Sequence, residues 1–405
     1  MRFVFRDTLP TTTVLLMLIG LVAQAFECKA ECMNEGCVDG ADCHGCDVQR
    51  AMCRPAEAVA KERESLPEAP SVIADQIPST SCAVVTESFL AAAGGLVEMQ
   101  YAVDGAPCIA QVYRDAELVE SQSNPTTGQH VQVYASRYFG KILTINGGLM
   151  ITTRDEHRYH EVLAHTPLAY LPHAARILVV GGGDGGLVSQ ALQHTNIREI
   201  VWCEIDEVVL RVSRQHFPQL AAAQTDPRVN LRIEDAAAFV AAEVAAATDD
   251  AKRQFDAILV DSTDSTVASS LFEAPFYSNC KRLLAPTRGI LAYNLDSPSW
   301  NLKWVAESAW QAAGLFRHAY VFHAAQPTYA SGHYAFLLAS DTIHPFRQPP
   351  DWRALAHKRL RTKYYTPDTH VASFVLPAQI ARALPMSARL HELPPGGVPP
   401  PEEAA

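Results

Sequence analysis

Four acidic residues between positions 184 and 261 each follow an apolar run, at the point where a buried strand is expected to end. They are Asp184, Glu204, Asp235 and Asp261. The carboxyl ends of parallel strands meet at one edge of an open α/β sheet, where such sheets bind ligands. The sequence therefore predicts an anionic pocket at that edge. Because buried like charges are costly unless they are compensated, we expect the ligand to be a cation.

The first of these acids lies in a glycine-rich run, Gly181 to Gly186, between an apolar segment and a helical pattern that starts at Leu187. A strand, a glycine turn and a helix bring ligand close to backbone in doubly wound folds, so Gly181 and Gly183 are predicted contacts. The carboxylate of Asp184 would repel a pyrophosphate and attract an ammonium or a sulfonium. The alternative interpretation is that Asp184 caps the following helix.

The next two acids fit a nucleoside. Glu204 stands about 20 residues past the glycines, where an acidic side chain accepts hydrogen bonds from ribose hydroxyls. Asp206, close behind it, is expected to cap the helix that begins at Glu207. Asp235 lies where an adenine edge would sit in the crevice, although a solvated acidic turn explains it equally well.

The fourth apolar run ends in Asp261-Ser262-Thr263-Asp264, with two carboxylates three residues apart. Both follow a central strand of the predicted sheet, so both lie at its ligand-binding edge. Taken together with Asp184, they complete the acidic pocket. A purely structural explanation for all of these strand-end acids is disfavoured.

The elements that must position these residues are predicted from the alternation of apolar runs. From residue 176 onward, strand and helix patterns alternate, which is typical of an open α/β sheet with helices on both faces. Upstream, short alternating segments at 96–101, 109–113, 130–135 and 141–145 predict a small antiparallel β domain. The expected limits are a leader at 1–25, a Cys-rich segment and linker at 26–79, a β domain at 80–148, a catalytic domain at 149–345, and a C-terminal extension with a disordered tail at 346–405.

The overall charge agrees with a cationic ligand. The 405 residues include 33 Lys and Arg against 44 Asp and Glu, a formal net charge of −11. This balance argues against nucleic acid as a main partner, because phosphate binding needs a basic face.

The N-terminus predicts a targeting segment. Arg2 and Arg6 precede an uncharged apolar run at 14–22, which ends close to Ala23-Gln24-Ala25, the small-residue pattern of a cleaved secretory signal. A signal anchor and an organelle-targeting leader stay open, and with them the compartment. Six cysteines between Cys28 and Cys53 are expected to pair as disulfides if that compartment is oxidising.

Three segments together resemble one enzyme family: ILVVGGGDGGLVSQALQH, VWCEIDEVVLRVSRQHFP and FDAILVDSTD, at 177–194, 201–218 and 255–264. They are similar to the polyamine aminopropyltransferases, the spermidine synthase family. The resemblance continues upstream in the D-E-x-x-Y-H-E pattern of 155–161 and downstream in the blocks at 327–332 and 363–377. It covers roughly residues 125–385.

The resemblance implies a β domain before a Rossmann-like, methyltransferase-type doubly wound sheet, in a homodimer. It implies transfer of the aminopropyl group of decarboxylated S-adenosylmethionine to putrescine or a related polyamine, giving spermidine and methylthioadenosine. The implied proton acceptor is Asp261, and Asp184 would pair with the aminopropyl ammonium. The other residues implied on the polyamine side are Tyr159, His160, Asp264 and Tyr329. Those implied on the nucleoside side are Gln129, Gly181, Gly183, Glu204, Asp235 and Ala236.

This chemistry needs no metal and no further cofactor, because the sulfonium of the donor is already a good leaving group. A polyamine with a pKa near 10 is protonated at neutral pH. A carboxylate beside it can take its proton as a general base.

Several positions depart from the family pattern. The residues after Asp264 lack the family's two prolines and its glycine, and Ala236, Met150 and Asn146 replace the usual Gly, Gln and Asp. The altered loop leaves the acceptor and the turnover open. Two alternatives therefore stand beside the main interpretation: an amine N-methyltransferase that uses intact S-adenosylmethionine, and a secreted polyamine-binding relative with little turnover.

Overall fold

The computed structural model describes residues 46–47, 52–53, 95–101, 107–246, 254–263 and 269–385. The chain splits into two units, of which the larger comprises Gly95–Asp104 and Cys108–Ala405. In the smaller unit the description covers Pro107 and the antiparallel pair β1 (Cys46–Asp47) and β2 (Met52–Cys53), in which Cys46 lies opposite Cys53. The predicted leader and the remaining Cys-rich segment lie outside the described residues. Among the described helices, none combines the length and apolar character needed to cross a bilayer.

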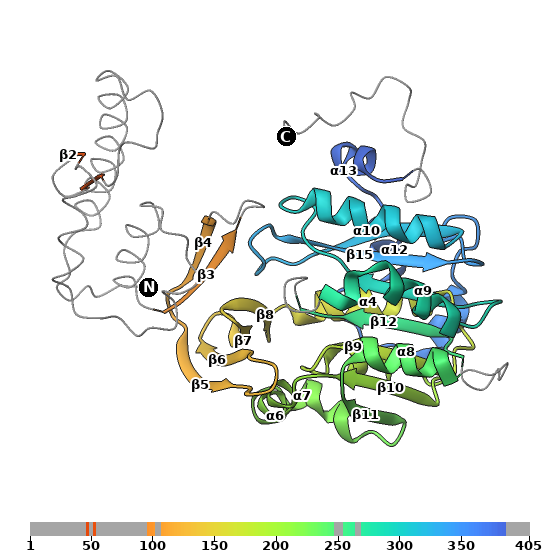
Figure 1. Cartoon of the computed structure of the whole chain (residues 1–405), viewed down its shortest axis with the longest axis horizontal. Coiled ribbons are helices and arrows are strands. Elements are labelled where there is room, and N and C mark those ends of the chain that lie inside the picture. The colour runs from red at the N-terminus through yellow and green to blue at the C-terminus, as the bar shows by residue number, and fades with distance from the viewer. Residues whose placement is uncertain are drawn as a thin grey trace, which may run out of the picture. The chain divides into compact units, whose positions relative to one another are not determined.

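The first part of the larger unit is antiparallel β-structure, as predicted (Figure 1). Strand β3 (Leu96–Tyr101) pairs with β4 (Pro107–Tyr113). A four-stranded meander follows, made of β5 (Glu117–Ser123), β6 (His130–Ser136), β7 (Gly140–Ile145) and β8 (Gly148–Thr152). A two-residue Asn146-Gly147 turn joins β7 to β8, and Asn146 adopts φ +52°, as hairpins of this length require.

The second part is a seven-stranded sheet in the order β11-β10-β9-β12-β13-β15-β14. The first five strands in that order run parallel, and β15 and β14 are antiparallel additions. The strands are β9 (Arg176–Gly181), β10 (Glu199–Glu204), β11 (Val229–Ile233), β12 (Ala257–Asp261), β13 (Ile290–Asn294), β14 (His318–Ala325) and β15 (His333–Ser340). This arrangement confirms the predicted Rossmann-like, methyltransferase-type fold.

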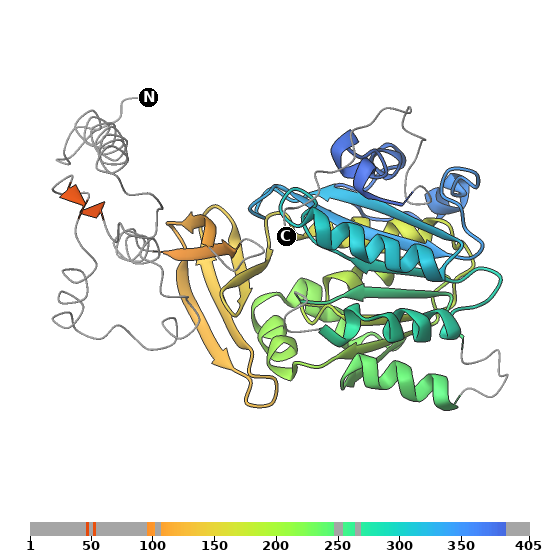
Figure 2. The same cartoon turned by 45° about the horizontal axis from the view of Figure 1, so that its top comes forward.

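Helices cover both faces of this sheet (Figures 1 and 2). The α-helices are α4 (Glu156–Ala169), α5 (Gly186–Ala191), α6 (Glu207–His216), α7 (Pro218–Ala221), α8 (Ala236–Ala246), α9 (Ala274–Leu283), α10 (Leu302–Leu315), α11 (Trp352–Lys358), α12 (Pro367–Ser373) and α13 (Ala378–Ala383). Two short 3₁₀ segments are η2 (Ala222–Thr225) and η4 (Ser269–Phe272).

The central strands are apolar between their end residues because both of their faces are buried. In β9, Leu178 and Val180 pack on one side with residues of α8, α9 and α10. Ile177 and Val179 pack on the other side with residues of α4 and α5. The alternation along one strand therefore builds two separate hydrophobic cores.

The strand order reverses between β9 and β12, which is where sheets of this kind bind ligands. At this position Asp261, the last residue of β12, pairs in register with Gly181, the last residue of β9. The fold thus brings the glycine-rich loop and the predicted catalytic acid side by side.

Candidate active site

The glycine-rich loop begins in direct contact with the end of β12. Gly181 has φ +74°, and a Cβ on it would lie 2.2 Å from the carbonyl oxygen of Asp261. The N–H of Gly182 donates to that same carbonyl at 2.7 Å, and the Trp202 indole N–H donates to the carbonyl of Gly181 at 2.7 Å. Only glycine fits at position 181, so the loop is held against the strand end.

The Asp261 carboxylate is held by a tyrosine from α4. Its Oδ1 accepts a hydrogen bond from the Tyr159 hydroxyl at 2.7 Å. Burial, followed by the nearby charge of Asp184, raises the pKa of Asp261 to about 6. A carboxylate with this pKa is ionised at neutral pH and is a better proton acceptor than a free aspartate.

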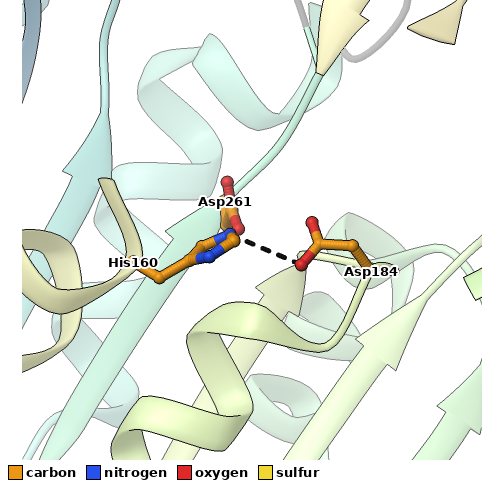
Figure 3. Close-up of side chains that lie close together, drawn as sticks. All are labelled: His160, Asp184 and Asp261. Carbon is orange, nitrogen blue, oxygen red and sulfur yellow. Dashed lines mark ion pairs between the residues drawn. The ribbon is translucent and has the colours of Figure 1, made fainter. Parts of the chain in front are cut away.

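His160 links two acids on the other side of the pocket. Its Nδ1 lies 2.7 Å from Oε2 of Glu156, one helical turn earlier, and its Nε2 lies 3.4 Å from Oδ1 of Asp184 (Figure 3). Burial alone would lower the pKa of His160, but the two carboxylates hold it well above its usual value. The imidazole is therefore protonated and neutralises part of the acidic cluster.

Asp184 lies just ahead of α5, whose N-cap residue is Gly185, and its contact with a cationic ligand stays a prediction. Its Oδ1 accepts from the N–H of Gly186 at 2.6 Å, at the start of α5. Burial would raise the pKa of Asp184, yet His160 and the backbone N–H keep it below its usual value, so the group stays ionised. A Cβ on Gly186 would lie 2.1 Å from the His160 ring, so this glycine leaves the room that the ring occupies.

Aromatic side chains line the predicted polyamine side. The Tyr159 ring contacts Tyr329, Tyr334 and Phe336, with centroids 6.4, 5.4 and 5.0 Å away. The Tyr329 hydroxyl donates to the carbonyl of Met150 at 2.7 Å, while that of Tyr159 donates to Asp261. Both phenol oxygens keep lone pairs that can accept further hydrogen bonds. Carboxylates and phenol oxygens together suit a donor-rich, positively charged group such as an alkylammonium.

Glu204 lies beneath the glycine loop on the predicted nucleoside side. Its Oε1 accepts from the N–H of Asp206 at 2.8 Å, and a Cβ on Gly183 would lie 2.8 Å from its Oε2. Burial, together with the charge of Asp206, raises the pKa of Glu204 to about 7 against the lowering effect of its backbone hydrogen bonds. A buried carboxylate of this kind gains most from a ligand that donates hydrogen bonds, such as a pair of hydroxyls.

Asp206 caps α6, as predicted, by accepting from the N–H groups of Val208 and Val209. The same carboxylate also accepts from Asn124 at 2.8 Å and from the hydroxyl of Thr127 at 2.9 Å. These bonds tie the loop between β5 and β6 to the sheet. Gln129, which ends that loop, is 4% exposed. The sequence alone gave no indication that Asp206 has this second function.

Asp235 is exposed and bonded to the start of α8, where its Oδ1 accepts from the N–H groups of Ala237 and Ala238 at 2.7 and 3.3 Å. Ala236 is buried beside it. Both follow β11 at the ligand-binding edge, and the predicted adenine contact stays a prediction. Asp264, the second predicted acid of the polyamine side, lies outside the described residues.

The D-E-x-x-Y-H-E segment contains three acids to which the sequence assigned no role. Asp155 accepts from the N–H of Thr328 at 3.1 Å and from its hydroxyl at 2.9 Å, which fixes the residue before Tyr329. Glu156 holds His160, and the spacing of four residues on a helix could have indicated this pair. Glu161 accepts from three consecutive backbone N–H groups, those of residues 363–365, each at 2.8 Å.

His160, Asp184 and Asp261 each offer an atom, all within 4.8 Å of one another, so they are the residues in the described part of the chain that could approach a metal ion. Both ring nitrogens of His160 already face carboxylates, and a metal would have to displace one of them. An ammonium needs only free acceptors. The donor set therefore favours an organic cation.

Comparisons with known proteins agree with this geometry. The family described as Spermine/spermidine synthase domain matches residues 156–348. The polyamine aminopropyltransferase of Leptospira biflexa serovar Patoc is 38% identical over 267 residues, covering 65% of this chain and 90% of that protein. The one from Alkaliphilus metalliredigens is 34% identical over 259 residues, covering 62% and 86%.

Comparison with solved structures points to the same family. A spermidine synthase in complex with the transition-state analogue AdoDATO superposes with a TM-score of 0.64 at 27% identity, covering 71% of this chain and 94% of that one. The spermidine synthase from Thermotoga maritima gives 0.62 at 26% identity with the same coverage. The chain belongs to the polyamine aminopropyltransferase (spermidine synthase) family.

Proposed function

We propose that the chain moves the aminopropyl group of decarboxylated S-adenosylmethionine to putrescine or a related polyamine, with Asp261 as the proton acceptor. The observation that carries the proposal is the position of Asp261. It ends the strand at the switch point, touches the glycine loop, and has a pKa of about 6. The names of the relatives and the transition-state analogue bound to one of them support the same reaction.

In the proposed step, Asp261 takes one proton from the acceptor ammonium. The freed nitrogen lone pair attacks the aminopropyl carbon, the carbon–sulfur bond breaks, and its electron pair stays on sulfur. Methylthioadenosine leaves neutral, and the product keeps its positive charge as a secondary ammonium. General-base catalysis of this kind commonly contributes about 10²–10⁴-fold, and holding the two reactants in line supplies much of the remainder.

The two substrates are proposed to occupy opposite sides of Asp261. Tyr159, Tyr329 and His160 line the polyamine side, together with Asp264. On the donor side, Asp184 pairs with the aminopropyl ammonium. Glu204 takes the ribose hydroxyls, while Gln129, Gly181, Gly183, Asp235 and Ala236 line the remainder of the nucleoside site. The carboxylates of Asp184 and Asp261 would disfavour the additional carboxylate of intact S-adenosylmethionine.

The proposal is tested with the full chain and each donor in turn, offered putrescine or spermidine, with both products identified by mass. We expect methylthioadenosine together with an amine that is heavier by one aminopropyl unit. S-adenosylhomocysteine with a methylated amine would instead identify an N-methyltransferase. Tight amine binding without product would identify a binding protein.

We also propose that no metal takes part and that the protein is a homodimer. Activity should survive dialysis against a chelator, and light scattering should give twice the mass of one chain. Loss of activity that Mg²⁺ or Zn²⁺ restores would contradict the first proposal, and a monomeric mass would contradict the second.

Residues 1–25 are further proposed to be a cleaved signal, because a basic start and an apolar run lead to Ala23-Gln24-Ala25. N-terminal sequencing of protein from its native host should then begin at Phe26. Retention of Met1 would contradict this proposal.

A further inference from the structure

The loop between β14 and β15 carries Tyr329, and a second group of residues, separate from the active-site acids, holds it in place. Asp155 at the start of α4 binds the N–H and the hydroxyl of Thr328. The carbonyl of Thr328 points elsewhere and accepts from the hydroxyl of Tyr113 at 2.8 Å. Tyr113 is the last residue of β4, more than two hundred positions earlier in the chain. Thr328, the residue before Tyr329, is therefore held through its N–H, its hydroxyl and its carbonyl.

Tyr113 is itself held rigidly. It is 6% exposed, and its ring meets Phe139 edge to face at a centroid distance of 5.2 Å. Its single hydroxyl proton can serve one acceptor, and the contact with Thr328 is the shortest of those available. When the NH₂ of Gln111 faces the neighbouring acceptors, it donates to Oε2 of Glu98 at 3.2 Å and to the Tyr113 oxygen at 3.1 Å.

Glu98 anchors this group to the antiparallel sheet. It is 4% exposed, and its Oε1 accepts from the N–H of Leu149 in β8 at 3.0 Å. The next residue of β8, Met150, supplies the carbonyl to which Tyr329 donates. The position of the Tyr329 ring thus depends on β3, β4 and β8 at once, through short polar contacts that are buried or partly buried.

We infer that Tyr113, supported by Glu98, is a positioning residue for the acceptor amine: it orients the Thr328 carbonyl and thereby holds Tyr329 against the pocket. This inference rests on the proposed role of Tyr329 in amine binding. Tyr113 acts through Thr328 and does not touch the reacting atoms, so its loss should weaken acceptor binding and spare both the proton acceptor and the donor site.

The test is Tyr113→Phe, which removes only the hydroxyl. We expect the KM for putrescine to rise about threefold to tenfold, the range of one buried hydrogen bond, with kcat and the KM for the donor within about twofold of wild type. The matched control is Tyr170→Phe, which removes the hydroxyl that bonds His370 at 2.8 Å. It should lower the melting temperature by a similar amount and leave both KM values unchanged.

The double variant separates positioning from general structural damage. If Tyr113 acts through Tyr329, adding Tyr113→Phe to Tyr329→Phe should raise the acceptor KM by less than twofold, whereas independent effects would multiply. Multiplying effects, a parallel rise of both KM values, or an acceptor KM no different from that of Tyr170→Phe would overturn the inference. An unchanged acceptor KM in Tyr329→Phe alone would instead contradict the proposed role of Tyr329.

Discussion

Buried and half-buried carboxylates occupy two kinds of environment in this protein. One group lies where chain segments meet: Asp155 at the start of α4, Glu161 inside that helix, and Asp206 ahead of α6. The other group lies at the carboxyl edge of the sheet, where Asp261 and Glu204 end β12 and β10. Members of both groups are acids beside apolar cores, and several are within a few residues of one another in sequence.

The first group is saturated with hydrogen bonds. Glu161 receives three backbone N–H groups, Asp206 receives two together with two side-chain donors, and Asp155 binds Thr328 twice and Thr152 once. Such acids join loops to helices. Their charge is already compensated, so they have little to offer a ligand.

The acids of the second group receive fewer hydrogen bonds than their oxygens can accept. Within the described residues, the side chain of Asp261 receives one hydrogen bond, from Tyr159, and burial raises the pKa of both Asp261 and Glu204, to about 6 and about 7. A raised carboxyl pKa in a pocket indicates a charge that the protein leaves for a ligand to compensate. The difference teaches that hydrogen-bond saturation, rather than burial, separates the acids that join chain segments from those proposed to contact substrates.

The largest effect is expected from a substitution at Asp261. Changing Asp261→Asn should lower the rate of transfer by about 10²–10⁴-fold, because the amide keeps the shape but cannot take the proton. Binding of methylthioadenosine, followed by calorimetry, should stay within about threefold. Activity within a few-fold of wild type would remove Asp261 from the mechanism.

A saturated acid should behave in the opposite way. Glu161→Gln replaces one acceptor oxygen with a donor that faces backbone N–H groups, so we expect a loss of about 2–4 kcal/mol in the free energy of unfolding. Enzymatic activity, assayed at a temperature well below the melting temperature, should change little. The control is Glu207→Gln on the exposed first turn of α6, which should alter stability by less than about 0.5 kcal/mol. An unfolding free energy equal to that of the control would show that the three bonds contribute nothing.

Asp184 is intermediate, since it is bonded to His160 and Gly186 and is still ionised. It should favour the decarboxylated donor over intact S-adenosylmethionine by at least about tenfold, or about 1.4 kcal/mol. Asp184→Asn should reduce this preference, measured as a ratio of dissociation constants. Equal affinities in the unchanged protein would refute the proposed ammonium contact.

The smallest effect concerns pH. Asp261 must be ionised to accept a proton, so kcat/KM for the acceptor at saturating donor should fall as the pH drops through about 6. The positive charge of the bound donor stabilises the ionised carboxylate of Asp261, so it can only lower the pH of that inflection. Between pH 7.5 and 6 we therefore expect no more than about a twofold loss.

Glu204→Gln provides the control for this profile. The variant should weaken donor binding and leave the inflection in place, because Glu204 does not transfer the proton. An inflection that disappears in this variant would assign the titration to Glu204 instead of Asp261.

Much of this architecture could be predicted from the sequence. The runs that became β9, β10 and β12 are apolar throughout, and glycine, glutamate and aspartate mark their ends, so element type and ligand edge both follow from local pattern. β5 was not predicted because its residues are mostly exposed and polar, and β14 and β15 were not assigned although their apolar patterns are clear. The register between strands is non-local, and no spacing in the sequence indicates it.

The sequence by itself determined the fold class, the identity of the acids at the strand ends, and the cap formed by Asp206, because strand periodicity and capping depend on neighbours along the chain. The tertiary structure decided which acids are left unsatisfied. Glu161 is compensated by the N–H groups of residues 363–365, and Asp155 by the N–H and hydroxyl of Thr328, partners that only folding brings within hydrogen-bond distance. Charge compensation depends on distance in space, so two acids in one short motif, Asp155 and Glu161, could not be assigned their roles until the chain had closed around them.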